Sequence, residues 1–163
     1  MFEELNKEEI FAAIIQALEE ELRIAVSAAR TAATDATNEE SKPENKYDTR
    51  ALEASYLARG QAQRVADLKE ALFGFRRLDL KKFTDNDSIS STALVELLSE
   101  GKKQILFFAA AGGGTQVQYR GTKIQVITPA TPLGQAVLKS KVGENIFVKV
   151  GKSEREFEIL RVK

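Results

Sequence analysis

The sequence predicts an α+β protein in which a long antiparallel helical hairpin precedes a small sheet-rich domain. In the first half of the chain, apolar residues recur at steps of three and four on both sides of a polar, turn-rich centre, which is the helical period. After a polar stretch at residues 84–91 the period changes. Short β-branched or aromatic segments then alternate with glycine-containing turns, a pattern that is typical of strands.

The two helical patterns mirror each other about Pro43 and Glu44. When the apolar positions are paired outward from this centre, the residue numbers of every pair add to 86 or 87. Small residues face small residues near the centre, and larger residues face larger ones further out. An antiparallel hairpin accounts for both regularities, because each residue then packs against its mirror partner. The pairs are Ala32–Ala54, Ala29–Ala58, Ala25–Ala62, Leu22–Val65, Leu18–Leu68, Ile14–Leu72 and Phe11–Phe75.

The first helix is expected over about residues 7–36, with Asn6 as its N-cap. The second is expected to start at Ser41–Pro43, because proline is tolerated in a first helical turn, and to run to about residue 82. We therefore expect a hairpin at residues 1–83 with an acidic tip near 37–48. A linker at 84–91 and a sheet-rich domain at 92–163 follow.

In the second half, glycine-containing turns separate the expected strands, and one short helix interrupts them over residues 132–139. Thr131 is the expected N-cap of this helix. The aromatic residues of this half are expected to form the core of the sheet: Phe107, Phe108, Tyr119, Phe147 and Phe157. The strands are expected at 92–98, 103–109, 116–119, 123–127, 145–150 and 155–162.

The composition excludes several classes of function. The 24 basic and 24 acidic residues cancel, which gives no reason to expect non-specific binding of nucleic acid. The absence of cysteine excludes disulfides and thiolate metal sites, and the absence of histidine removes the usual general base. No apolar run approaches the roughly 20 residues that span a bilayer. We therefore expect a soluble, cytoplasmic protein without membrane association that is not itself an enzyme.

The acidic tip admits two interpretations. Glu44 and Asp48 are four residues apart and would lie on one helical face, with Glu40 just before the turn. Two carboxylates at this spacing can share a hydrated Mg²⁺ ion. The same run, Ser41-Lys-Pro-Glu44, also fits a capping box, in which Glu44 only bonds back to the N-cap amide. The residue types alone leave both interpretations open.

Two segments resemble the Gre transcript-cleavage factors (the GreA/GreB-like family), as does the order of hairpin and sheet domain. The run Ile127-Thr-Pro-Ala-Thr-Pro-Leu-Gly-Gln-Ala-Val-Leu-Lys-Ser-Lys-Val-Gly-Glu144 is similar to the family's Ser-Pro-Leu-Gly-x-Ala-Leu…Lys-x-Val-Gly-Asp segment. The run Glu154-Arg-Glu-Phe-Glu-Ile-Leu160 resembles the family's last strand. The resemblance implies a C-terminal domain with an FK506-binding-protein-like fold without isomerase activity. It also implies that this domain docks on bacterial RNA polymerase, at the rim of the secondary channel, through Thr131, Pro132, Leu133 and Gly134.

At the tip, Gre factors carry Asp-Leu-Ser-Glu-Asn, whose Asp and Glu help to hold the second catalytic Mg²⁺ of the polymerase. Here the run is Ser41-Lys-Pro-Glu-Asn45, which retains Glu44 and Asn45 but places serine at the Asp position. The resemblance implies a Mg²⁺ ion shared with the polymerase through Glu44 and Asp48, only in the complex. Glu40 or Asp48 is then the acid that replaces the missing Asp.

The implied function is that of a transcription elongation regulator, a monomer with no cofactor of its own. It would bind RNA polymerase, insert its hairpin into the secondary channel, and meet RNA and DNA only through the elongation complex. It would either stimulate the polymerase's intrinsic transcript cleavage or be a channel-binding relative without that effect. A generic coiled-coil adaptor or chaperone is the alternative of a different class, and it would use the sides of the hairpin, where Leu52, Tyr56 and Leu57 lie outside the paired positions.

Overall fold

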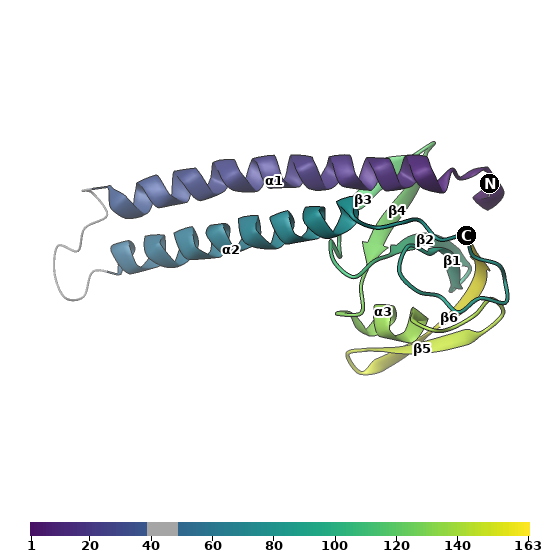
Figure 1. The fold of residues 1–163 in the computed structure, drawn as a ribbon. Helices are drawn as coiled ribbons and strands as arrows, with labels where there is room; N and C mark the ends of the chain where they lie inside the picture. Colours follow the sequence, from purple (N-terminus) through teal and green to yellow (C-terminus); the bar gives the residue numbers. More distant parts are fainter. Residues whose placement is uncertain (39–48) are drawn as a thin grey trace. The chain divides into compact units, whose positions relative to one another are not determined.

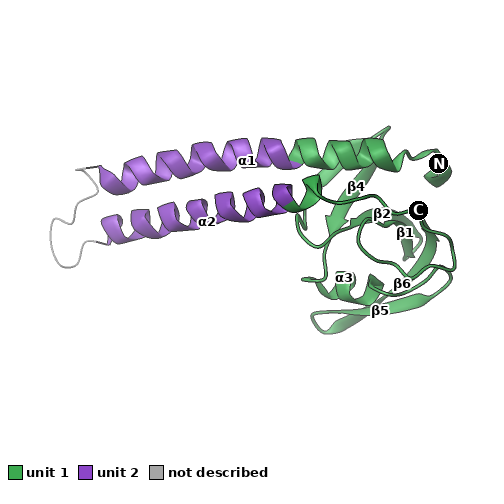
Figure 2. Cartoon of the chain, in the orientation of Figure 1, with its two compact units in different colours: residues 1–17, 74–163 green, residues 18–73 purple. Residues whose placement is uncertain are grey.

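The computed structural model describes residues 1–38 and 49–163 of the 163-residue chain (Figure 1). The chain divides into two compact units (Figure 2): unit 1 comprises residues 1–17 and 74–163, and unit 2 comprises residues 18–73. The elements are the 3₁₀ helix η1 (Phe2–Glu4), α1 (Lys7–Thr37), α2 (Arg50–Arg76), β1 (Leu94–Ser99), β2 (Lys102–Phe108), β3 (Gln116–Tyr119), β4 (Thr122–Ile127), α3 (Pro132–Val137), β5 (Asn145–Val150) and β6 (Ser153–Val162).

Unit 2 consists of the paired parts of α1 and α2, which run antiparallel. Arg64 on α2 forms an ion pair of 2.9 Å with Glu21 on α1, and these residue numbers add to 85, close to the predicted sums. Among the described residues, no helix combines the length and the apolar composition that crossing a bilayer requires. The predicted hairpin is confirmed here by burial as well as by the ion pair: the buried residues are Leu18, Ala25, Ala32, Leu68, Ala71 and Leu72.

The mirror pairs of the two helices form an apolar seam, and one of its predicted members, Ala62, is wrong. Ala62 is exposed, whereas Gln61 beside it is half-buried. The half-buried positions of α2 in this region are Ala58, Gln61 and Val65, so that the seam steps by three and then by four residues. Because a helix has 3.6 residues per turn, either order of steps keeps the seam on one face. The seam therefore contains Gln61, although the apolar pattern predicted Ala62.

Unit 1 contains a six-stranded mixed sheet in the order β3-β4-β2-β1-β6-β5. The β2–β4 pair is parallel and the other neighbours are antiparallel. Thus the predicted α+β class, a helical hairpin followed by a sheet-rich part, is confirmed. The bounds of β3 and β5 are those predicted, and every other strand begins and ends within two residues of its expected bounds.

One face of the sheet forms an apolar core beneath α3. Val137 of α3 and Ile89 of the preceding segment are both fully buried in this core. Phe108 and Phe157 are buried there, as predicted, but Phe147 is 56 % exposed, so its predicted role as a core residue is wrong. The buried residues that the sheet contributes are Val95, Leu97, Leu106, Phe108, Ile127, Ile146, Val148, Phe157, Ile159 and Val162.

The other face of the sheet packs against the first turns of α1 and the last turn of α2, all within unit 1. The rings of Phe11, Phe75 and Phe107 form a triad with centroid distances of 5.8, 5.9 and 6.2 Å. The stacked Phe11–Phe75 contact is one of the mirror pairs that the sequence predicted. In unit 1, the hydroxyl of Tyr119 on β3 also donates a hydrogen bond to Glu9 on α1. Both contacts fix the base of the hairpin to the sheet.

The second helix ends earlier than expected, at Arg76 rather than near residue 82. The amide of Lys81 donates to Thr92 Oγ1 at 3.0 Å, and its carbonyl accepts from the Lys7 ammonium group. These tertiary hydrogen bonds replace the helical ones that would otherwise satisfy the backbone. The expected linker at 84–91 also packs into unit 1, because Ile89 is fully buried. A boundary between independently folding domains at this linker stays a prediction.

Candidate functional site

The segment from Thr128 to Gly134 is the described part of the predicted site, and its geometry follows from a helix cap. Thr131 is the N-cap of α3, as predicted: its hydroxyl accepts a hydrogen bond from the Gly134 amide at 3.1 Å and donates one to the Thr128 carbonyl at 3.2 Å. Pro132 occupies the first turn, where its missing N–H costs nothing. The threonine and the proline of this motif therefore have a local structural role.

Close packing explains why residue 134 is a glycine. A Cβ atom built at this position would lie 1.8 Å from the Thr128 carbonyl oxygen and 2.6 Å from its carbon, where real Cβ atoms stay beyond 3.0 Å. Only glycine lets α3 approach the end of β4 this closely. Gly134 is buried and Leu133 is half-buried against the core, whereas Thr131 and Pro132 are exposed. Of the four predicted docking residues, Thr131 and Pro132 are thus the ones whose side chains reach the surface.

Residues 84–91 are held beside α3 in a way that sequence reasoning missed. The amide of Lys139, a residue with a positive φ of 70°, donates to the Ile89 carbonyl at 2.9 Å, and the Ile89 amide donates to the Ser140 carbonyl at 2.9 Å. These bonds hold residues 84–91 beside the end of α3. The signal in the sequence was Ile89, a single large apolar residue in an otherwise polar stretch.

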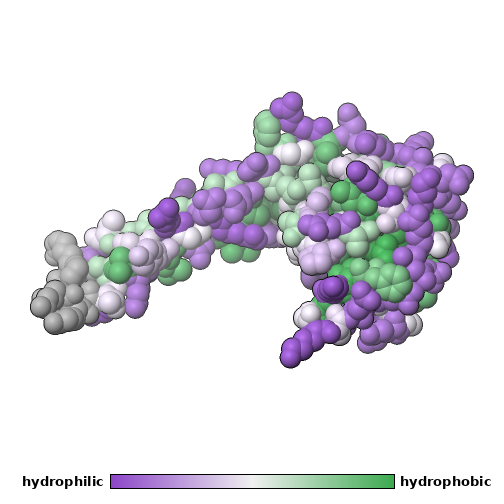
Figure 3. Space-filling model, turned by 90° about the horizontal axis from the view of Figure 1, so that it is seen from below, coloured by the Kyte–Doolittle hydropathy of each residue, from purple (hydrophilic) through white to green (hydrophobic). Residues whose placement is uncertain are grey.

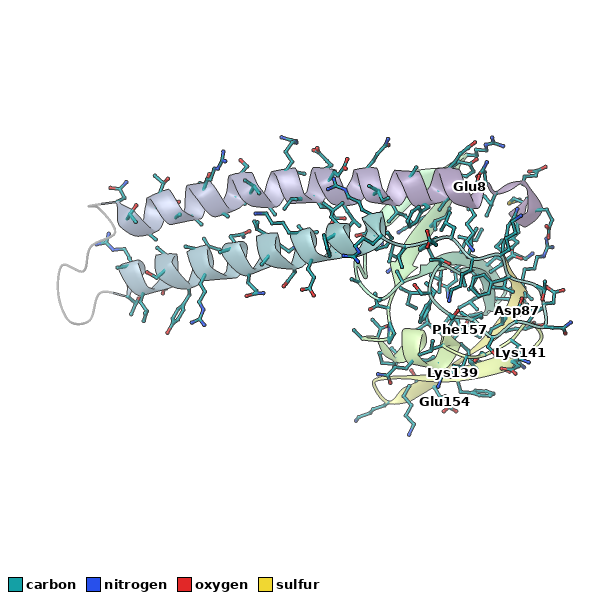
Figure 4. All side chains as sticks on the ribbon, in the orientation of Figure 1. Glu8, Asp87, Lys139, Lys141, Glu154 and Phe157 are labelled. Carbon is teal, nitrogen blue, oxygen red and sulfur yellow. The ribbon has the colours of Figure 1, made fainter. Side chains whose placement is uncertain are left out.

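The turn at the start of that segment adds charge to this part of unit 1. The Asp87 carboxylate accepts hydrogen bonds from the amide and the hydroxyl of Thr84, at 2.7 and 2.8 Å. These bonds lower the pKa of Asp87, and the bond from the Thr84 amide has the largest effect. The positive charge of the nearby Lys141 also lowers this pKa. Figure 4 labels Asp87, Lys139 and Lys141, and all three are exposed. This part of unit 1 therefore carries exposed charged groups beyond the C-terminal end of α3.

In unit 2, apolar side chains reach the surface outside the seam. Leu52, Tyr56 and Leu57 on α2 are 53, 64 and 55 % exposed, and Ile24 on α1 is 55 % exposed. Leu57 and Ile24 line a groove of about 460 Å³ between the helices, with Ala28 and Ala32 among its other lining residues. The surface that the adaptor alternative requires is therefore present on the described part of the hairpin.

The predicted tip residues lie outside the described residues. This holds for Glu40, Glu44, Asn45 and Asp48, and also for Ser41 and for the expected start of the second helix. Their capping and metal-binding interpretations both stay predictions. Within residues 1–38 and 49–163, no group of three or more Asp or Glu side chains is arranged to hold a metal ion.

At the start of α1, a cavity of about 530 Å³ contains an amine that sequence reasoning did not single out. The Lys7 ammonium group donates to the main-chain oxygens of Lys81 and Lys163, the latter at 2.8 Å, and lies 4.7 Å from the centre of the Phe83 ring. Burial, and then the charge of Lys163, lower the pKa of Lys7 to about 8. Because it joins three separate segments of unit 1, Lys7 serves the fold.

A scan against protein-family models found no match, and a search of curated proteins found none. Among solved structures, the chain is similar to the GreA factor homolog 1 (Gfh1) protein of Thermus thermophilus, with 18 % identity, a TM-score of 0.38, and coverage of 93 % of this chain and 95 % of that chain. Thermus aquaticus Gfh1 matches with 19 % identity, a TM-score of 0.39, and coverage of 93 % and 94 %. The transcription elongation factor GreA/GreB from Nitrosomonas europaea matches with 18 % identity, a TM-score of 0.36, and coverage of 59 % and 78 %.

Proposed function

We propose that this protein is an accessory factor of bacterial RNA polymerase that inserts its helical hairpin into the secondary channel and regulates elongation. The observation that carries the proposal is the antiparallel pair of α1 and α2. α1 has 31 residues and is about 46 Å long at 1.5 Å per residue. It ends, and α2 begins, on either side of the stretch that contains Glu44 and Asp48. A narrow helical pair with carboxylates at the connection suits entry into a channel.

The resemblance of residues 127–144 to the Gre factors supports the same proposal. In that segment the structure explains Thr131 and Gly134 by capping and close packing. Thr131 and Pro132 are the exposed side chains of this motif, and with them the segment would dock at the rim of the channel. The polymerase supplies the catalysis, and this chain acts only on the environment of the polymerase's metal ions.

Docking is tested with the full-length chain and core RNA polymerase. Pro132→Arg changes an exposed side chain, and we expect it to weaken binding at least roughly tenfold, about 1.4 kcal/mol, because a buried charge at an interface lacks its partner. Lys152→Glu, a charge change at the exposed β5–β6 turn, is the control and should bind as the wild type does. If Pro132→Arg binds with unchanged affinity and the chain is folded, the docking role of this segment is refuted.

Cleavage is tested on a backtracked elongation complex by following the 3′ RNA fragments over time. Glu44→Gln separates the two interpretations of the tip, since the amide can still cap a helix but is a poor ligand for Mg²⁺. If the wild type stimulates cleavage and Glu44→Gln binds without stimulating it, Glu44 directs the metal ion. If Glu44→Gln cleaves as well as the wild type, the metal interpretation fails.

If the wild type binds the polymerase but does not stimulate cleavage, the serine at position 41 is the expected reason. Ser41→Asp then tests for a gain of cleavage, because it restores the acid that Gre factors carry there. A gain would assign the chain to the channel binders that have lost cleavage through this one position. If Ser41→Asp does not stimulate cleavage, the regulatory effect on the polymerase comes from other residues of the hairpin.

A lateral adaptor is the second candidate function, and the exposure of Leu52, Tyr56 and Leu57 favours it. Exposed apolar patches on a soluble protein often mark interaction sites. The double variant Leu52→Glu and Tyr56→Glu should abolish partner binding by an adaptor, whereas Glu44→Gln should leave it unchanged. A channel factor should instead bind the polymerase in both variants and lose stimulation of cleavage only in Glu44→Gln.

A further inference from the structure

The strand β5 (Asn145–Val150) is an edge of the sheet and, among the described residues, pairs with β6 alone. Edge strands present unpaired N–H and C=O groups that can pair with another chain. The two-residue turn after β5 makes Val150 and Ser153 a hydrogen-bonded pair. By alternation, the backbone groups of Ile146 and Val148 also bond to β6. Those of Asn145, Phe147 and Lys149 then point away from the sheet.

The two edges of the sheet differ in how they are protected. At the other edge, β3 has four residues, and its Tyr119 is bonded to Glu9 on α1. Short length and attachment to a neighbouring element are ordinary protections of an edge strand. β5 has six residues, contains no proline, and pairs with β6 without a bulge. It also carries Phe147, which is 56 % exposed.

Unit 1 shows hydrophobic surface when the molecule is viewed from below Figure 1, the side on which β5 is drawn (Figure 3). Besides Phe147, Val150 on the same strand is 52 % exposed. Single exposed apolar residues are normal on a protein surface, but an aromatic ring on an open sheet edge can be covered by one further strand. A strand that covered this edge would need side chains that match those of β5.

In contrast to the monomer that the resemblance implies, we propose that β5 pairs with β5 of a second copy of this chain, antiparallel about a two-fold axis at Phe147. In this register Phe147 faces its own copy, and aromatic cross-strand pairs stabilise antiparallel sheets. On the core face, Ile146 lies opposite Val148, two residues that are already buried. The strand is thus complementary to itself, which is the requirement for a two-fold interface.

The charges favour the same register. Lys149 of one copy lies opposite Asn145 of the other, whose amide group donates to Glu156 at 2.7 Å. The ammonium group therefore approaches a carboxylate. A register centred on Lys149 would instead place two ammonium groups opposite each other, which is unfavourable, and would pair only part of the strand. The register at Phe147 pairs all of β5 and opposes no like charges.

Sedimentation of the full-length protein over a range of concentrations tests the association. We expect a dimer fraction that rises with concentration, and Phe147→Glu should weaken the dimer at least roughly tenfold because it opposes two carboxylates on the axis. Phe73→Glu is the matched control: Phe73 is an exposed phenylalanine (62 %) on α2, and its replacement should leave the dimer unchanged. A protein that stays monomeric up to about 1 mM, or a Phe147→Glu variant that associates like the wild type, overturns the proposal.

Cysteine substitution tests the register, because the natural chain has no cysteine. A hydrogen-bonded pair on antiparallel strands has Cα atoms about 5.5 Å apart, within the range of a disulfide. In a glutathione buffer, Phe147→Cys should form a covalent dimer. Asn145→Cys and Lys149→Cys should each fail alone and form a covalent heterodimer when mixed. Equal cross-linking of all three variants alone, or no disulfide at Phe147→Cys, refutes this register; the assay does not involve the polymerase.

Discussion

Replacing Gly134 by alanine tests whether the glycine of the Pro-Leu-Gly motif serves packing or docking. The added Cβ atom would lie 1.8 Å from the Thr128 carbonyl oxygen, at least 1.2 Å short of the 3.0 Å limit for real contacts. Since the clash is with backbone, α3 must move as a whole. The Thr131 cap would move with it, because the Gly134 amide is the donor to the Thr131 hydroxyl.

The expected loss of stability combines two terms. Overpacking typically costs about 1–3 kcal/mol, and loss of an N-cap bond costs about 1 kcal/mol. We therefore expect Gly134→Ala to lower the free energy of unfolding by about 3 kcal/mol. For a chain of this size, the midpoint of thermal unfolding should fall by roughly 6–12 °C. Urea denaturation followed by circular dichroism measures the first quantity, and a thermal scan measures the second.

Gly74→Ala is the matched control in the same unit. Gly74 lies in α2, and nothing comes within 4 Å of a Cβ atom built there. Alanine should stabilise the helix by about 0.5–1 kcal/mol, so the two substitutions should have opposite signs. If Gly134→Ala unfolds within about 1 kcal/mol of the wild type, the close approach of α3 to Thr128 is not what requires glycine. A loss of polymerase binding at unchanged stability would assign Gly134 to docking instead.

Three further outcomes are expected. Phe107→Ala should lower the free energy of unfolding by about 3–5 kcal/mol in urea titrations, because Phe107 is fully buried between Phe11 and Phe75; a loss below about 1 kcal/mol would contradict the triad's role. Ala29→Leu should overpack the half-buried seam of unit 2 and cost about 1–3 kcal/mol, measured by thermal unfolding at 222 nm, and unchanged stability would show that the helices are not closely packed there. The pKa of Lys7, lowered from 10.5 to about 8, means that between these pH values the unfolded chain keeps a proton that the folded chain releases. Stability should therefore rise with pH over this window, by up to about 3 kcal/mol relative to a Lys7→Met variant; parallel pH profiles of the two proteins would refute the shift.

The hairpin could be predicted because its information is local and repeated. The 3.6-residue period and the mirrored side-chain sizes were enough to pair Phe11 with Phe75, and their rings stack in the structure. Likewise, Thr131 before Pro132 was enough to place the N-cap of α3. Glycine-containing turns fixed both ends of β5. In each case the residues that decide the structure lie within a few positions of it, or occur in matched sets.

Tertiary structure alone decided the features that depend on distant partners. α2 ends at Arg76, and five residues later the backbone of Lys81 bonds to Thr92 and Lys7 rather than along a helix. Gly134 is required by the carbonyl group of Thr128, a contact that no local period records. The exposure of Phe147 depends on the strand order, because β5 is at the edge and, within the described part of the chain, pairs with a strand on one side only. A hydrogen bond or a buried contact between distant segments depends on how the whole chain folds, so the sequence pattern around either partner does not contain it.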